Sequence, residues 1–88
     1  MLEEQRRAID AFDYSAPAEM FVTHGGFKRG SSMAYHRFET AAEALRFAVE
    51  EVPAALLVRA TLEVLEERFD HQAIQTLYHR ADYPLARH

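Results

Sequence analysis

The segment AEMFVTHGGFKRGSSMAYHRF, residues 18–38, contains two runs of strand-forming residues on either side of a glycine-rich loop. Phe21, Val22 and Thr23 favour a strand over 18–23, and Tyr35 and Phe38 favour a second strand over 33–38. The two runs predict a β-hairpin with a long tip. Its register decides which side chains the sheet buries, because a shift of one residue moves every side chain to the other face.

Two registers of this hairpin are compatible with the pattern. In the preferred register His24 pairs with Met33, and the face that carries Met20 and Val22 also carries Met33 and Tyr35. In the register shifted by one residue, Met33 and Tyr35 leave that face. Ala34, His36 and Phe38 take their place.

The residues after the hairpin predict an amphipathic helix. Thr40 and Glu43 match a capping box, in which the side chain of each bonds to the backbone N–H of the other. From Ala41 to Val52 apolar residues recur at helical spacing, and Pro53 ends the helix. Phe47 lies off this stripe, so it either packs against the last helix, which we prefer, or is exposed for a partner.

A second helix is predicted near the end of the chain, where Asp70 is the expected N-cap. Phe69 and Ile74 occupy the two ends of a hydrophobic staple around it, and Pro84 ends the element. The stripe expected to face the core is Ile74, Leu77, Tyr78 and Ala81.

Between these helices, the segment from Leu56 to Glu66 alternates with a period of two, which indicates a strand with one buried face. A helix over Ala54 to Glu67 is the weaker alternative, because three of its residues are β-branched. The buried set is Val58, Ala60, Leu62 and Val64, and the exposed set is Arg59, Thr61 and Glu63.

The predicted fold is therefore α+β with the order β-β-α-β-α. A right-handed crossover from the second strand to the third places the third strand beside the first or beside the second. We prefer the order 2-1-3, a three-stranded, mainly antiparallel sheet with both helices packed on one face. The other face is then open, and the third strand is an edge at which a second copy can pair.

The chain is expected to form one domain over residues 17–85, because 88 residues provide a single core. Residues 1–16 have only a thin apolar stripe and are expected to form a mobile arm or a short helix, and residues 86–88 a C-terminal tail. The chain has no cysteine, no apolar run of bilayer length and no secretory signal, so we expect a cytoplasmic protein without a membrane span.

Positive charge is concentrated around the tip of the hairpin. The segment from Met20 to Phe38 carries a charge of +3, whereas the chain as a whole carries −4 and the remainder therefore −7. A net acidic chain disfavours nucleic-acid binding over a broad face but leaves a local basic loop available. The candidate binding residues are Phe27, Lys28, Arg29 and Arg37.

Other chemistries find little support in the sequence. The spacing of Gly25 and Gly30 resembles a phosphate-binding loop, but Ser31 stands where the essential lysine belongs, and the loop joins two strands. His24 and His36 lack an evident third ligand for a catalytic zinc ion. We therefore expect no metal, no cofactor and no enzyme activity.

Three fold-bearing segments resemble small uncharacterised bacterial proteins of fewer than a hundred residues. They are residues 14–19 (YSAPAE), residues 44–51 (ALRFAVEE) and the closing residues 77–78 and 82–85 (LY and DYPL). The resemblance implies an intact small domain and no particular activity. We expect a non-enzymatic interaction or regulatory module that contacts a protein or a second copy through the open sheet face and the hairpin tip. The alternative is a weak nucleic-acid binder that uses Lys28, Arg29 and Arg37.

Overall fold

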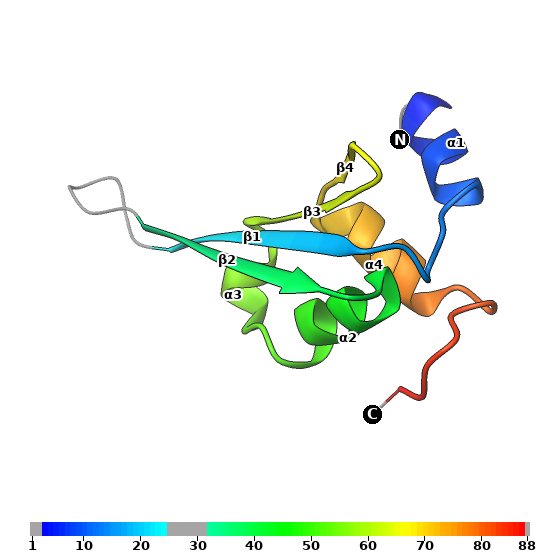
Figure 1. Ribbon diagram of the computed structural model, residues 1–88. Helices are drawn as coiled ribbons and strands as arrows, with labels where there is room; N and C mark the ends of the chain where they lie inside the picture. The colour runs from blue at the N-terminus through cyan, green and yellow to red at the C-terminus, as the bar shows by residue number, and fades with distance from the viewer. Residues whose placement is uncertain (1–2, 25–31, 88) are drawn as a thin grey trace.

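The computed structural model describes residues 3–24 and 32–87. Its elements in chain order are α1 (Glu3–Asp10), β1 (Ala18–His24), β2 (Ser32–Phe38), α2 (Ala41–Glu50), α3 (Ala54–Leu57), β3 (Ala60–Val64), β4 (Glu67–Phe69) and α4 (His71–His79) (Figure 1). The predicted α+β class is confirmed. The predicted β-β-α-β-α order is extended by α1, by the single turn α3 and by β4.

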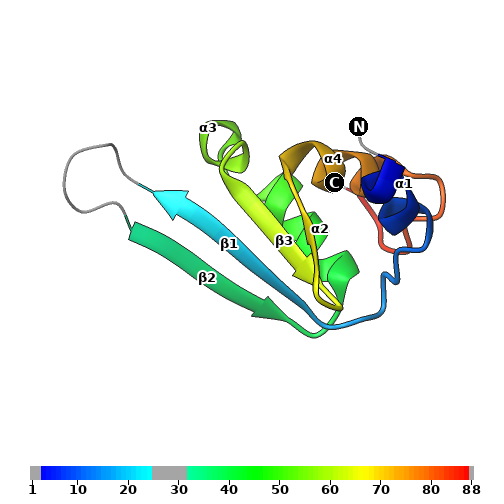
Figure 2. The ribbon, with the colours of Figure 1, turned by 90° about the horizontal axis from the view of Figure 1, so that it is seen from above.

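The strands form one antiparallel sheet in the order β2-β1-β3-β4. The preferred order of the first three strands is confirmed, whereas the expectation of only three strands is wrong. α2 and α4 pack against each other and lie on the same face of the sheet (Figures 1 and 2). β4 pairs with β3, so β3 is not the edge that the sequence predicts.

The fourth strand follows β3 through a two-residue turn. Leu65 and Glu66 at its centre have φ values of 51° and 69°. Two-residue hairpin turns with positive φ at both central residues are usually recognised by an Asn-Gly or Asp-Gly pair. Because leucine and glutamate occupy this turn, the sequence contains no such signal for β4.

The hairpin of β1 and β2 adopts the shifted register, and the preferred register is wrong. Val22 pairs with Ala34, and Met20 pairs with His36. Met33 consequently lies on the exposed face, with 61% of its surface accessible. The preferred register would have placed the guanidinium of Arg37 beneath the helices, because residues two apart on a strand share a face.

The start of α2 is capped by its own residues and by the segment before β1. Thr40 Oγ1 accepts from the backbone N–H of Glu43, as predicted, but the Glu43 carboxylate accepts from the Thr40 hydroxyl rather than from its backbone. The backbone N–H groups of Ala41 and Ala42 donate to the carbonyl oxygens of Ala16 and Tyr14, at 2.7 and 3.0 Å. The first backbone N–H groups of a helix have no acceptor within the helix, and segment 14–16 supplies two of these acceptors for α2.

The predicted start of α4 is confirmed. The Asp70 carboxylate accepts from the backbone N–H of Ala73 at 2.9 Å, and Phe69 and Ile74 are both buried. Of the predicted stripe, only Ala81 is exposed, because α4 ends at His79.

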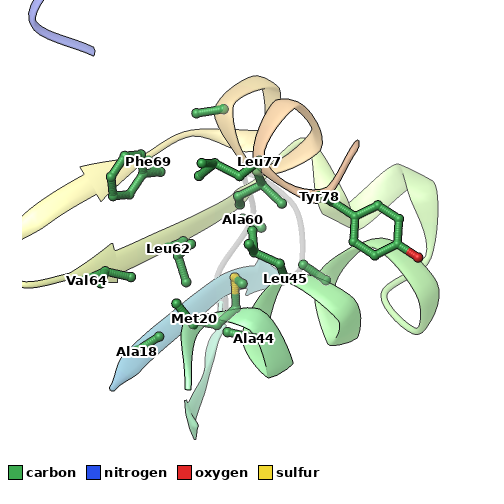
Figure 3. Close-up of a cluster of buried hydrophobic side chains, with 14 of the residues drawn as sticks. Ala18, Met20, Ala44, Leu45, Ala60, Leu62, Val64, Phe69, Leu77 and Tyr78 are labelled. Carbon is green, nitrogen blue, oxygen red and sulfur yellow. The ribbon is translucent and has the colours of Figure 1, made fainter. Parts of the chain in front are cut away.

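The core lies between the sheet and the two longer helices. Met20 and Leu62 of the sheet lie with Leu45 of α2 and Leu77 of α4 in this layer (Figure 3), and all four are fully buried. Phe47 does not pack against α4 as preferred. It is half-buried over β2, where its ring centroid lies 4.7 Å from that of His36.

Both ends of the described chain contribute to the packing. Ile9 of α1 is 5% exposed and belongs to the core, and its carbonyl oxygen accepts from Arg80 at 2.7 Å. Near the other end, Arg87 Nε donates to the carbonyl oxygen of Tyr78 at 2.9 Å. Residues 3–10 form a short helix, which is one of the two alternatives expected for residues 1–16, and both ends of the described chain contact the rest of the molecule.

Candidate functional site

The face of the sheet opposite α2 and α4 is covered by no element of the described chain (Figure 2). Alternation along paired strands assigns the side chains of this surface, which we call the open face. It consists of Glu19, Phe21 and Thr23 of β1, Met33, Tyr35 and Arg37 of β2, Thr61 and Glu63 of β3, and Arg68 of β4.

One row of the open face is charged. The register aligns Arg37, Glu19, Glu63 and Arg68 across the four strands. Arg68 Nε lies 3.7 Å from Glu63 Oε1. Two cations and two anions leave this charged row with no net charge, so it favours neither a polyanion nor a polycation. A shallow depression of about 200 Å³ lies beside it, between Pro17 and Glu66.

The next row of the open face is largely apolar. The rings of Tyr35 and Phe21 lie 5.3 Å apart, and Thr61 pairs with Phe21 on its other side. The Tyr35 hydroxyl donates to Glu19 Oε2 at 2.5 Å, and this hydrogen bond raises the pKa of the phenol, with burial and the Glu19 charge adding to it. Met33 extends the apolar surface toward the start of β2.

The predicted basic patch is only partly described. Phe27, Lys28 and Arg29 lie outside the described residues. Arg37 lies on β2, five residues from Ser32, and an extended strand covers roughly 17 Å over that length. Arg37 therefore belongs to the charged row beside Glu19 and not to a compact cluster at the tip.

The alternation along residues 56–66 predicts Arg59, Thr61 and Glu63 on the open face. Thr61 and Glu63 are there, half-buried, whereas Arg59 precedes β3 in the turn after α3. The contributions of Met33 and Tyr35 were missed because the preferred register assigned them to the core. The charge on Arg37, two residues beyond Tyr35, is the signal that identifies the correct face.

A second depression, of about 360 Å³, lies between the segment before β1 and the closing segment, with Tyr14 and Asp82 in its lining. The Tyr14 hydroxyl donates to the carbonyl oxygen of Leu77 at 2.8 Å. Burial, together with the nearby Asp82 carboxylate, raises the pKa of Tyr14 to about 12. This phenol is therefore neutral and committed to a structural hydrogen bond at physiological pH.

Two further tyrosines close the same end of the molecule. The Tyr83 hydroxyl donates to the carbonyl oxygen of Ala42 at 2.8 Å, and the Tyr78 hydroxyl donates to the Glu50 carboxylate. The Arg87 guanidinium lies 5.5 and 5.2 Å from the centres of the Tyr78 and Tyr83 rings. These contacts hold the closing segment to α2 and α4, which assigns the cluster a structural role.

The raised pKa of Tyr14 predicts a loss of stability at high pH. The pKa of a tyrosine in an unfolded chain is about 10. Between pH 10 and 12 the unfolded state therefore binds fewer protons than the folded state. The free energy of unfolding then falls as pH rises. Urea unfolding at pH 9, 10 and 11 measures this fall, which we expect to be smaller in Tyr14→Phe because the titrating hydroxyl is absent. An equal fall in both proteins contradicts the assignment.

The described residues include neither a metal-binding cluster nor a membrane-spanning helix. No three histidine, aspartate or glutamate side chains in residues 3–24 and 32–87 lie close enough together to hold a metal ion. Within the same ranges, no helix combines the length and the apolar character required to cross a bilayer.

Comparisons with protein-family models, with curated proteins and with solved structures found no match. Function must therefore be argued from the residues of this chain. The open face is the surface on which apolar and charged side chains lie together without a covering element in the described structure.

Proposed function

We propose that the protein is a non-enzymatic interaction module that binds a protein partner through the open face. The observation that carries the proposal is the exposure of Met33 and Tyr35, at 61% and 51%, beside Phe21 on one uncovered sheet face. An apolar centre with a polar rim is the usual composition of a protein interface. The charged row supplies such a rim on one side.

The shape of the open face also supports a protein partner. Its depression of about 200 Å³ is smaller than the roughly 300–1,000 Å³ of typical small-molecule pockets. A flat surface offers a partner area to cover, and a sheet whose backbone is already ordered spares the cost of ordering a loop on binding.

Photocrosslinking tests this function. A benzophenone side chain in place of Thr61, at the centre of the open face, is expected to crosslink a defined protein in the native cells. Thr61→Arg is expected to weaken binding of that purified protein at least tenfold, because the guanidinium obstructs the surface next to Phe21. Val58→Arg, at an exposed apolar residue outside the sheet, is the matched control and should bind normally. Equal binding by both variants contradicts the proposal.

The nucleic-acid alternative stays a prediction, and none of the described contacts favours it. Arg37, its one described residue, lies in a neutral row. Titration with single-stranded RNA and DNA at low and high salt tests it, since phosphate contacts weaken with salt. Binding that is lost in a Lys28→Ala and Arg29→Ala double variant would favour this alternative over the open face.

A further inference from the structure

One edge of the sheet has few of the features that usually prevent strand pairing, and its one formally charged residue is Arg37. β2 is outermost in the sheet, and no described strand pairs with its outer side (Figure 2). Its seven residues pair with β1 without a bulge, and they include neither proline nor lysine. Natural proteins protect exposed edges with short strands, bulges, proline or lysine. β2 therefore offers a regular row of backbone donors and acceptors.

The opposite edge is protected. β4 has only three residues, Glu67–Phe69, and the first two are charged and exposed. The difference between the edges identifies β2 as the side of the sheet at which another strand can be added.

Apolar side chains flank the β2 edge on both faces of the sheet. On the open face Met33 and Tyr35 are more than half exposed. On the helix side Phe38 and His36 are half-buried, and their rings lie 5.4 and 4.7 Å from the ring of Phe47 on α2. A strand added at this edge would form backbone hydrogen bonds with β2. It would also cover apolar side chains on both faces of the sheet.

We infer that a second copy of this chain pairs with β2 in an antiparallel arrangement, so that the two sheets become continuous. This inference goes beyond the proposed function, because the contact is made by the edge of β2 and not by the open face. The two-fold axis passes beside Tyr35, the middle residue of β2, which then lies opposite its own copy. Met33 lies opposite the partner's Arg37, so the Arg37 guanidinium groups of the two copies do not face each other.

Charge favours a second copy over an acidic or basic peptide. The only formally charged residue of β2 is Arg37, which faces Glu19 in the neutral charged row. The edge therefore requires no opposite charge from its partner. An antiparallel edge is also complementary to itself under two-fold symmetry.

The available area suits a dimer of moderate affinity. Seven strand residues extend about 24 Å, and a sheet with one helix layer, each layer about 10 Å thick, is roughly 20 Å deep. Such an edge covers on the order of 500 Å² on each copy, or about 1,000 Å² in total, which is the lower limit for a specific interface. A dissociation constant in the micromolar range is expected.

Sedimentation velocity of the full chain tests self-association. The wild-type protein should sediment as a dimer at about 100 μM, and Val58→Lys should do the same. Tyr35→Lys places two ammonium groups opposite each other and should raise the dissociation constant at least tenfold. A wild-type protein that is monomeric up to about 1 mM, or a Tyr35→Lys variant that dimerises normally, overturns the inference.

A mixed disulfide distinguishes edge pairing from stacking of two open faces. The chain has no cysteine, so Ala34→Cys and His36→Cys variants introduce single thiols on the helix side of β2. In the edge dimer these two positions are opposite each other, within the distance that a disulfide requires. Mixing the variants should give a disulfide-linked heterodimer, whereas Val58→Cys mixed with His36→Cys should not. Failure to form it overturns edge pairing, and the Thr61 experiment tests the open face separately.

Discussion

Deletion of residues 1–16 is expected to unfold the protein at room temperature. The deletion removes the buried Ile9, the partly buried Phe12 and Tyr14, and the two carbonyl acceptors of α2. Burial of one large side chain contributes about 1.5–3 kcal/mol and each hydrogen bond about 1 kcal/mol. The sum is comparable to the roughly 5 kcal/mol, or somewhat more, by which a chain of this length is stable.

Far-ultraviolet circular dichroism and urea titration of the truncated chain measure this effect. Arg6→Ala in the full chain is the control, because Arg6 is exposed on α1, and its effect should stay within about 0.5 kcal/mol. A truncated protein that unfolds cooperatively at the wild-type urea concentration would show that residues 1–16 are a dispensable arm.

Leu62→Asp is the substitution with the largest expected effect. Leu62 has no accessible surface and lies on the central strand β3, opposite both Met20 and Phe69. Replacing a buried leucine by a small residue costs about 2–5 kcal/mol, and an unpaired carboxylate in the same place adds several kcal/mol more. The variant should therefore be unfolded under conditions in which the wild-type protein is folded.

Thr61→Asp is the matched control for this variant. It introduces the same charge one residue earlier on the same strand, but on the open face, where water reaches the carboxylate. Its cost should stay below about 1 kcal/mol. Heat and urea unfolding of both variants, followed by circular dichroism, compare them. Similar losses of stability in the two variants would contradict the alternation of buried and open faces on β3.

The elements that were predicted correctly are those with a strong local signal. Thr40 and Asp70 precede their helices with the expected capping chemistry, and the side chain of each accepts from a backbone N–H as predicted. The alternation of Ala60, Leu62 and Val64 correctly identified the buried face of β3, whereas Val58, predicted on the same face, lies outside the strand and is 57% exposed. In each of these places local preference and tertiary packing agree.

The errors arose where tertiary structure overrides local preference. The turn at Leu65 and Glu66 requires positive φ from residues that rarely adopt it, so β4 was missed. The preferred hairpin register placed Met33 and Tyr35 on the face of Met20 and Val22, although the charge of Arg37 argues for the opposite face. Exposed apolar residues such as Met33 and Tyr35 mislead such an assignment, because their side chains are of the same types as those of the core.

The distribution of tyrosines has a spectroscopic consequence. The chain has no tryptophan and four tyrosines. Tyr14, Tyr78 and Tyr83 lie together in one packed cluster, with ring centroids of neighbouring pairs 5.0 and 5.8 Å apart. Tyr35 lies alone on the open face. Near-ultraviolet dichroism therefore reports mainly on the packing of this cluster, where the segment before β1 meets the closing segment, which we call closure. Far-ultraviolet dichroism reports on the sheet and helices. Coincidence of the two melting curves would establish that closure and folding are a single transition.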